Sequence, residues 1–84
     1  MSVNIRGMSR RGMVETAFGS NGVGACVVPF AVKGDIVVGV YNVATGASAS
    51  SSFETTVTVT GQVQQSSSTN NAANEFDFYI APQS

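Results

Sequence analysis

The sequence predicts an all-β fold, a small antiparallel β-sandwich or barrel of about five strands preceded by an extended N-terminal arm. Two observations lead to this class. Segments in which apolar and polar residues alternate with a period of two recur along the chain, whereas no helical periodicity does. Turns rich in Gly, Ser and Asn separate these segments. We therefore expect an arm over residues 1–12 and a single all-β domain over residues 13–84.

Charged residues are scarce in this chain. They make up 11% of the sequence, less than half of the roughly 25% found in soluble domains. A chain of 84 residues buries only about 60 to 65% of its surface on folding, and a single cysteine excludes an intrachain disulfide. Because interface cores are depleted in charge, we expect self-association to supply stability. A monomer with a Ser/Thr-rich surface is the alternative.

The first twelve residues, MSVNIRGMSRRG, are basic, whereas the rest of the chain is acidic. Arg6, Arg10 and Arg11 give the arm a charge of +3, and residues 13–84 carry −4. Since arginine pairs well with carboxylates, we expect the arm to contact acidic positions on a neighbouring subunit. A frayed terminus is the alternative. Nucleic-acid binding is disfavoured by the acidic body.

Neither a targeting segment nor a membrane span is expected. The arm lacks the apolar stretch of a signal peptide. No apolar run approaches the roughly 20 residues that cross a bilayer as a helix.

The first half of the chain predicts three strands. Residues 13–18 alternate as a short strand, and the glycine-rich segment 19–24 that follows has the Asn-Gly pair of a tight turn. Residues 25–32 and 35–43 flank Lys33-Gly34, which predicts a hairpin. Both arms of this hairpin are apolar on both faces, as in strands that are central in a sandwich or pressed against another subunit.

Two details modify this hairpin. Pro29 removes one ladder donor, so the first arm is expected at a sheet edge or with a bulge. Gly39, between valines, indicates a bulge or a close approach of backbone.

The second half predicts two further strands. Residues 53–64 show the cleanest alternation, with Phe53, Val57 and Val63 among the residues on one face, and are expected to form one long strand. Residues 75–80 alternate again, with aromatic side chains toward the core. The uncharged segments 44–52 and 65–74 are predicted to be loops.

Enzymatic chemistry is not expected. The chain has no histidine, and Cys26 lies in an apolar run that indicates a buried structural thiol. Glu75 and Asp77 lie two residues apart on one strand, a weak signal for metal or acid/base chemistry and a better one for a solvated face or a docking site for the arm. We expect no cofactor, no metal and no small-molecule substrate.

A compact β body that is poor in charge, rich in Ser, Thr, Asn and Gln, and preceded by the basic arm MSVNIRGMSRRG resembles small structural virion proteins of tailed bacteriophages, such as capsid decoration or tail components. The resemblance implies assembly by repeated self-contact, a location in the virion, and other virion proteins as partners. The subunit-contact candidates are Arg6, Arg10, Arg11, Glu75 and Asp77. The alternative is a binding module that presents loops 44–52 and 65–74 to a receptor or glycan.

Overall fold

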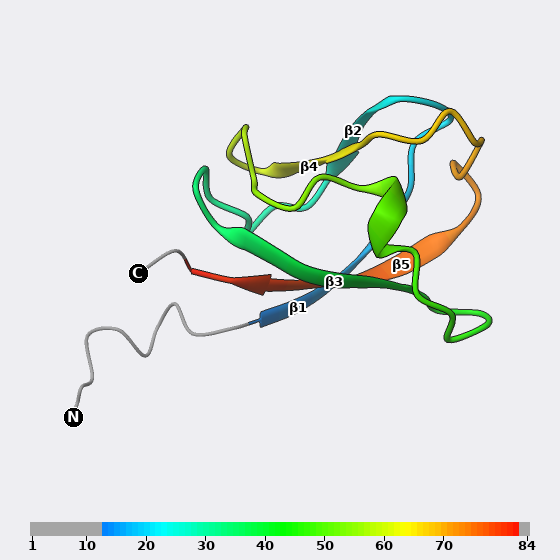
Figure 1. Cartoon of the computed structure of the whole chain (residues 1–84), viewed down its shortest axis with the longest axis horizontal. Helices are drawn as coiled ribbons and strands as arrows, with labels where there is room; N and C mark the ends of the chain where they lie inside the picture. The colour runs from blue at the N-terminus through cyan, green and yellow to red at the C-terminus, as the bar shows by residue number, and fades with distance from the viewer. Residues whose placement is uncertain (1–12, 83–84) are drawn as a thin grey trace.

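The computed structural model describes residues 13–82, so Arg6, Arg10 and Arg11 lie outside the described residues. It confirms the all-β class, with five strands in two antiparallel sheets (Figure 1). The strands are β1 (Met13–Phe18), β2 (Gly24–Val27), β3 (Ile36–Asn42), β4 (Gln62–Gln65) and β5 (Glu75–Ala81), and a short 3-10 turn covers Ser50–Ser52. One sheet has the order β1-β5-β3, and the other consists of β2 and β4.

The strands predicted over residues 13–18 and 75–80 are confirmed as β1 and β5. In β5, Phe76, Phe78 and Ile80 are buried while Glu75 and Tyr79 are exposed. Strand β1 pairs antiparallel with β5 along its whole length, from Met13 opposite Ile80 to Phe18 opposite Glu75. Local alternation identified these strands because each turns one face toward the core and the other outward, which fixes the side-chain register.

The predicted hairpin between residues 25–32 and 35–43 is wrong. A turn does form, with Asp35 N donating to Val32 O at 2.9 Å and Gly34 at a φ of 98°. It carries the chain from one sheet to the other, because β2 pairs with β4 and β3 pairs with β5. Pro29 is not in a strand either. Strand β2 has ended by then, and Pro29 lies in a separate turn closed by Ala31 N and Val28 O at 3.0 Å.

The glycine-rich segment 19–24 is likewise a connection between the sheets. It joins β1 to β2, two strands that belong to different sheets, so the Asn-Gly pair does not close a hairpin.

The long strand predicted over residues 53–64 is also wrong. Only β4 is regular, and it begins where the predicted strand ends. The chain reverses just before β4, with Gly61 at a φ of 85° and Gln62 N donating to Val59 O at 3.1 Å. Phe53, Val57 and Val63 do point inward as predicted, but Val59 is 46% exposed. The alternation of apolar and polar residues continues through the turn before β4, so the sequence pattern does not reveal where the chain reverses.

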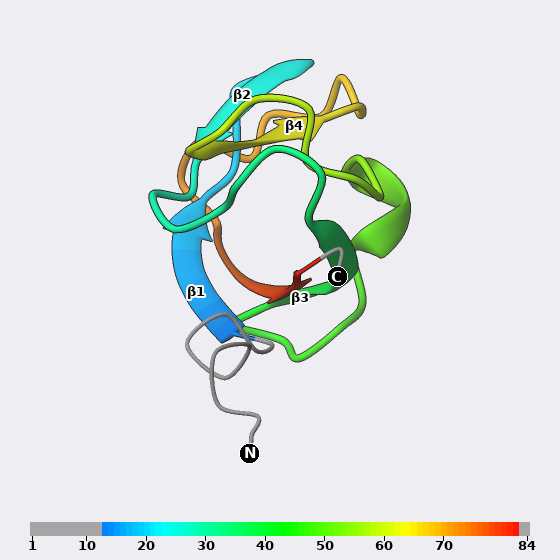
Figure 2. The same ribbon diagram turned by 90° about the vertical axis from the view of Figure 1, so that its left-hand side faces the viewer.

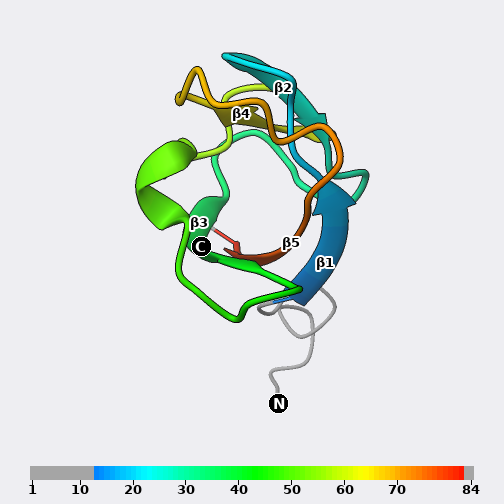
Figure 3. The same cartoon turned by 90° about the vertical axis from the view of Figure 1, so that its right-hand side faces the viewer.

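Residues 53–57, here called the closing segment, join the two sheets on one side. Thr55 O accepts from Val37 N of β3 at 2.9 Å, and Asp35 O accepts from Val57 N at 2.8 Å. On the opposite edge of this segment, Glu54 N donates to Gln64 O of β4 at 2.9 Å. The five strands and the closing segment therefore form an open barrel, visible end-on in Figures 2 and 3.

The core fills the interior of this barrel. Phe53 of the closing segment meets Phe76 and Phe78 of β5 edge to face, with ring centroids 5.2 Å apart in both pairs. Such pairs add about 0.5 to 1.5 kcal/mol beyond area burial. The other buried apolar residues are Cys26, Val28, Ala31, Val37, Val40, Val57, Val63 and Ile80.

Gly39 marks a bulge, as its position predicted. The register of β3 against β5 shifts between Val37 and Gly39, so Val38 is the extra residue and is 67% exposed. The ring of Tyr41 lies over Gly39, since a Cβ there would lie 3.0 Å from Tyr41 Cε1. The bulge thus turns one additional apolar side chain to the outside of the sheet.

Loop 65–74 is anchored by a buried amide. Gln65 is fully buried, and its Oε1 accepts from Ser20 N at 2.9 Å and from Asn71 Nδ2 at 3.3 Å. Its Nε2 donates to Ser67 O and Thr69 O, both at 2.8 Å. The amide therefore satisfies four hydrogen-bonding positions and ties this loop to the segment after β1.

Replacing Gln65 with Leu should destabilise the fold by about 2 to 4 kcal/mol, because it leaves buried polar partners unsatisfied. Gln62→Leu is the control, since the Gln62 side chain is half-buried and bonds only to Gln64 Nε2, at 3.0 Å. Urea unfolding followed by circular dichroism measures both. Equal midpoints for the two variants would contradict the anchoring role.

Gly19 should tolerate no side chain. A Cβ there would lie 2.5 Å from Asn71 Cβ and 2.9 Å from Asn71 O, whereas at Gly22 the nearest atom is 3.9 Å away. We expect Gly19→Ala to lower the free energy of unfolding by about 1 to 3 kcal/mol, and Gly22→Ala to change it by less than about 0.5 kcal/mol. Thermal unfolding of both variants tests the difference, and an unchanged Gly19→Ala midpoint would refute the close packing.

Candidate subunit-contact site

The two acidic candidates predicted from the sequence lie on the outer surface of the three-stranded sheet. Asp77 accepts a hydrogen bond from Thr16 Oγ1 at 2.6 Å, and Glu75 lies opposite Phe18 in the β1 register. Neither forms an ion pair within residues 13–82. Their contact with Arg6, Arg10 or Arg11 stays a prediction, because those residues are outside the described range.

Apolar side chains cover much of the same surface. We define the outer sheet face by its exposed apolar residues, which are Val14 and Phe18 of β1, Ile36, Val38 and Tyr41 of β3, and Tyr79 of β5. Tyr41 and Tyr79 pack edge to face with ring centroids 5.5 Å apart. Exposed apolar side chains that gather on one face of a sheet, as Val14, Val38 and Tyr79 do here, are a mark of an interaction site.

Part of the outer sheet face is hollowed. The hollow has a volume of about 330 Å³ and is lined by Met13, Val14, Val38, Tyr79, Ile80 and Ala81. It lies where the register pairs Val14 with Tyr79 and Tyr79 with Gly39, beside the bulge. No charged side chain lines it, so the hollow suits an apolar group of a partner.

The edges of the strands are covered unevenly. The outer edge of β3 bonds to Ala49 and Thr55, and that of β4 bonds to Glu54, while Ser52 bonds to the residues just after β4. Strands β1 and β2 each have one ladder partner, β5 and β4, and within residues 13–82 no backbone hydrogen bond joins β1 to β2. The open side of the barrel therefore presents two free strand edges, which is the arrangement that pairs with added strands.

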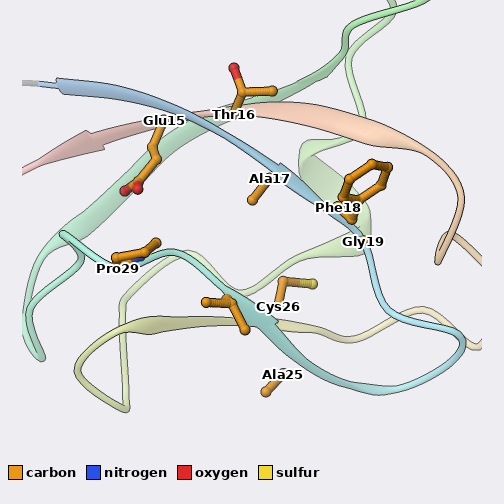
Figure 4. A pocket seen from close by; sticks show the side chains of 9 residues that line it. Glu15, Thr16, Ala17, Phe18, Gly19, Ala25, Cys26 and Pro29 are labelled. Carbon is orange, nitrogen blue, oxygen red and sulfur yellow. The ribbon is translucent and has the colours of Figure 1, made fainter.

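A groove of about 490 Å³ lies between these two edges (Figure 4). Residues 15–19 of β1 and its following turn line one side, and Ala25, Cys26, Val27 and Pro29 line the other. Glu15 points from β1 toward Pro29, and its Oε1 accepts from Phe30 N at 3.2 Å. Glu15 is thus a half-buried carboxylate at one end of an otherwise largely apolar groove.

Cys26 is buried, as predicted. It is 2% exposed, and burial raises the pKa of its thiol, an effect that a backbone hydrogen bond from Ser20 partly offsets. The raised pKa keeps the thiol protonated at neutral pH and lowers its reactivity.

The remaining chemistry of the described residues is sparse. Residues 13–82 contain no cluster of three His, Cys, Asp or Glu side chains that would hold a metal ion. In the same part of the chain, no helix has the length and apolar character needed to cross a membrane. Comparisons with protein-family models, curated proteins and solved structures find no match to the chain.

Neither Glu15 nor Val38 was among the site residues predicted from the sequence. Glu15 shares its face of β1 with Met13 and Ala17, both packed against the core, so a carboxylate among core residues was the available signal. The sequence gives no sign that Val38 is exposed. Its exposure follows from the bulge, whereas strand alternation predicts only which of the two faces a residue shares with its neighbours.

We expect Cys26 in the folded protein to react with iodoacetamide at pH 7.5 at least about tenfold more slowly than in the urea-unfolded chain, since burial blocks access and disfavours the thiolate. Mass spectrometry of timed samples measures the rate. Equal rates in the folded and unfolded chain would show that the thiol is accessible. Because the folded state holds the protonated form, this residue's contribution to stability should decline as the pH rises through the alkaline range.

Proposed function

We propose that this protein is a non-enzymatic structural subunit of a symmetric homo-oligomeric assembly, a component of a tailed-bacteriophage virion such as a capsid decoration or tail protein. The observation that carries the proposal is the apolar outer sheet face, which lies on the same sheet as the free edge of β1. Subunits contact one another through this face and through the strand edges.

A second copy of the chain is the partner that the composition favours. The chain has few charges. Residues 13–82 carry five carboxylates and one lysine, while the three arginines lie in the arm. One chain thus carries both halves of an electrostatic match, as well as an apolar patch of the kind that obligate interfaces bury.

A structural role is supported by what the described side chains can do. The buried thiol has a raised pKa, and the chain has no histidine to activate it. The acidic residues on β5 face outward and do not gather around a pocket, because neither lines the groove or the hollow. General acid/base catalysis needs such groups converging on a substrate.

The virion assignment rests on the layout of the chain, a small β body behind a basic arm, which resembles small structural proteins of tailed phages. The alternative, a module that binds a receptor or glycan through loops 44–52 and 65–74, stays a prediction. Contacts within these loops do not favour it. Asn42 Oδ1 accepts from Ala44 N at 2.8 Å, and Ser67 Oγ donates to Thr69 Oγ1 at 3.0 Å, so polar groups of both loops are used internally.

Charging the outer sheet face should weaken self-association. Val38→Asp places a carboxylate beside the hollow, and we expect the dissociation constant of the assembly to rise by about 10- to 100-fold, since an unpaired charge would be buried at the contact. Val23→Asp is the matched control, because Val23 is 72% exposed and Val38 67%, but Val23 lies outside the outer sheet face.

Sedimentation velocity and native mass spectrometry over a range of micromolar concentrations measure both variants, with circular dichroism to check folding. A wild-type chain that remains monomeric at every concentration would overturn the proposal. So would an assembly that both substitutions weaken equally, because the outer sheet face would then have no special role.

A further inference from the structure

We propose that the groove between β1 and β2 binds the arm, residues 1–12, of a second copy of this chain as an extended segment, with an arginine of the arm pairing with Glu15. The inference rests on the proposed function in that it needs a second copy. The inference places the binding site of the arm at Glu15 of β1, whereas the sequence predicted Glu75 and Asp77 of β5.

The groove supplies backbone hydrogen-bonding groups. Alternate residues of an antiparallel strand direct their N–H and C=O groups to the side away from the partner strand. In β1 and β2 that side faces the groove, because β5 and β4 occupy the other edges. An extended peptide that lies along either edge satisfies these groups, in the manner of strand addition.

Glu15 supplies a negative charge that has no counter-ion within residues 13–82. Its Oε1 accepts from Phe30 N at 3.2 Å, while Oε2 has no partner within residues 13–82. The side chain is half-buried, which makes an unpaired carboxylate more costly than it would be at an open surface. A guanidinium presents two parallel N–H donors and so pairs with a carboxylate that has a free oxygen.

The arm is the source of cations that the chain itself offers. The sequence contains four basic residues, of which Lys33 is the one that belongs to residues 13–82. Arg6, Arg10 and Arg11 lie within twelve residues, a segment that reaches about 40 Å when extended. The groove follows residues 15–19, about 17 Å of strand, so the arm is long enough to leave one subunit and fill the groove of the next.

Geometry favours a neighbouring groove over the chain's own. The arm joins β1 at Met13, and the groove extends from Glu15 toward the other end of β1. A segment that continues the direction of β1 backward from Met13 therefore runs away from this groove. Filling its own groove would require an immediate reversal, whereas the groove of an adjacent copy requires none.

Disulfide trapping between full-length chains tests which groove is used. One chain carries Ser9→Cys in the arm, and a second carries Val27→Cys, a groove position that is 70% exposed. After mixing and mild oxidation, we expect the linked heterodimer at about tenfold higher yield than with Val43→Cys as the acceptor, because disulfides need Cα atoms within about 7 Å. Val43 is 49% exposed and follows β3, on the opposite edge of the sheet from β1.

The unmodified chain, in which Cys26 is buried, serves as the blank for this experiment. Equal yields with Val27→Cys and Val43→Cys would overturn the inference. A chain that carries both Ser9→Cys and Val27→Cys tests the chain's own groove. If it links internally in preference to linking with a neighbour, the assignment to a second copy is overturned.

Limited trypsin digestion tests the role of Glu15. Glu15→Gln keeps an Oε1 acceptor for Phe30 N but removes the charge, so we expect cleavage after Arg10 and Arg11 in the assembled protein to become about tenfold faster. Glu75→Gln removes the same charge on the outer surface and should leave the wild-type rate. Unchanged rates in Glu15→Gln, or acceleration in Glu75→Gln alone, would overturn the pairing with Glu15.

Sedimentation of the same samples separates the two proposals. A monomeric wild-type chain would refute the assembly itself. An assembly whose arm is cut as fast as a free peptide, with no trapped heterodimer, would refute the arm-groove contact and leave the outer sheet face as the interface.

Discussion

Closure of the barrel by residues 53–57 is the constraint on which the rest of the structure depends. A two-stranded sheet is marginal in water, and here β2 and β4 form one. The closing segment connects that pair to the three-stranded sheet, through Thr55 O to Val37 N and through Glu54 N to Gln64 O. It also packs Phe53 against the aromatic rings of Phe76 and Phe78 in β5. Backbone pairing and core packing thus act at the same place.

This closure is one-sided, and the candidate interaction surfaces follow from that asymmetry. The chain covers the edges of β3 and β4 with its own residues 47–57 but has no further described segment for the edges of β1 and β2. The bulge at Val38 adds an apolar side chain to a sheet face that also carries Val14, Tyr41 and Tyr79. Monomeric proteins normally blunt free edges with charges, prolines or bulges. On the open side, Glu15 is the single charged residue lining the groove.

The alternation of apolar and polar residues predicted individual strands, but it did not predict which strands pair. β1 and β5 were predictable because their side chains alternate between an inner and an outer face over the full strand, half-buried inside in β1 and buried inside in β5. The pairing of β2 with β4 was not, since Lys33-Gly34 does form a turn and only competition among distant strands decides that the turn joins two sheets. The reversal at Gly61 was hidden because alternation runs through it. Alternation also predicted that Glu75 and Asp77 lie on the face of β5 opposite the core. The groove could not be predicted, because it lies between the edges of β1 and β2 and no sequence pattern relates those two edges.

The two proposed contacts differ in physical character and therefore in what each supplies to an assembly. The exposed apolar side chains of the outer sheet face would provide affinity that salt does not screen, because burying them removes apolar surface from water. A contact between an arm and a groove is heterologous, because the contacting patches on the two subunits differ, and it gives the assembly a direction. Its ion pair at Glu15 discriminates between correct and incorrect registers more than it adds free energy. In the proposed assembly, the outer sheet face would therefore supply most of the affinity, and the contact between arm and groove would set the relative orientation of the subunits.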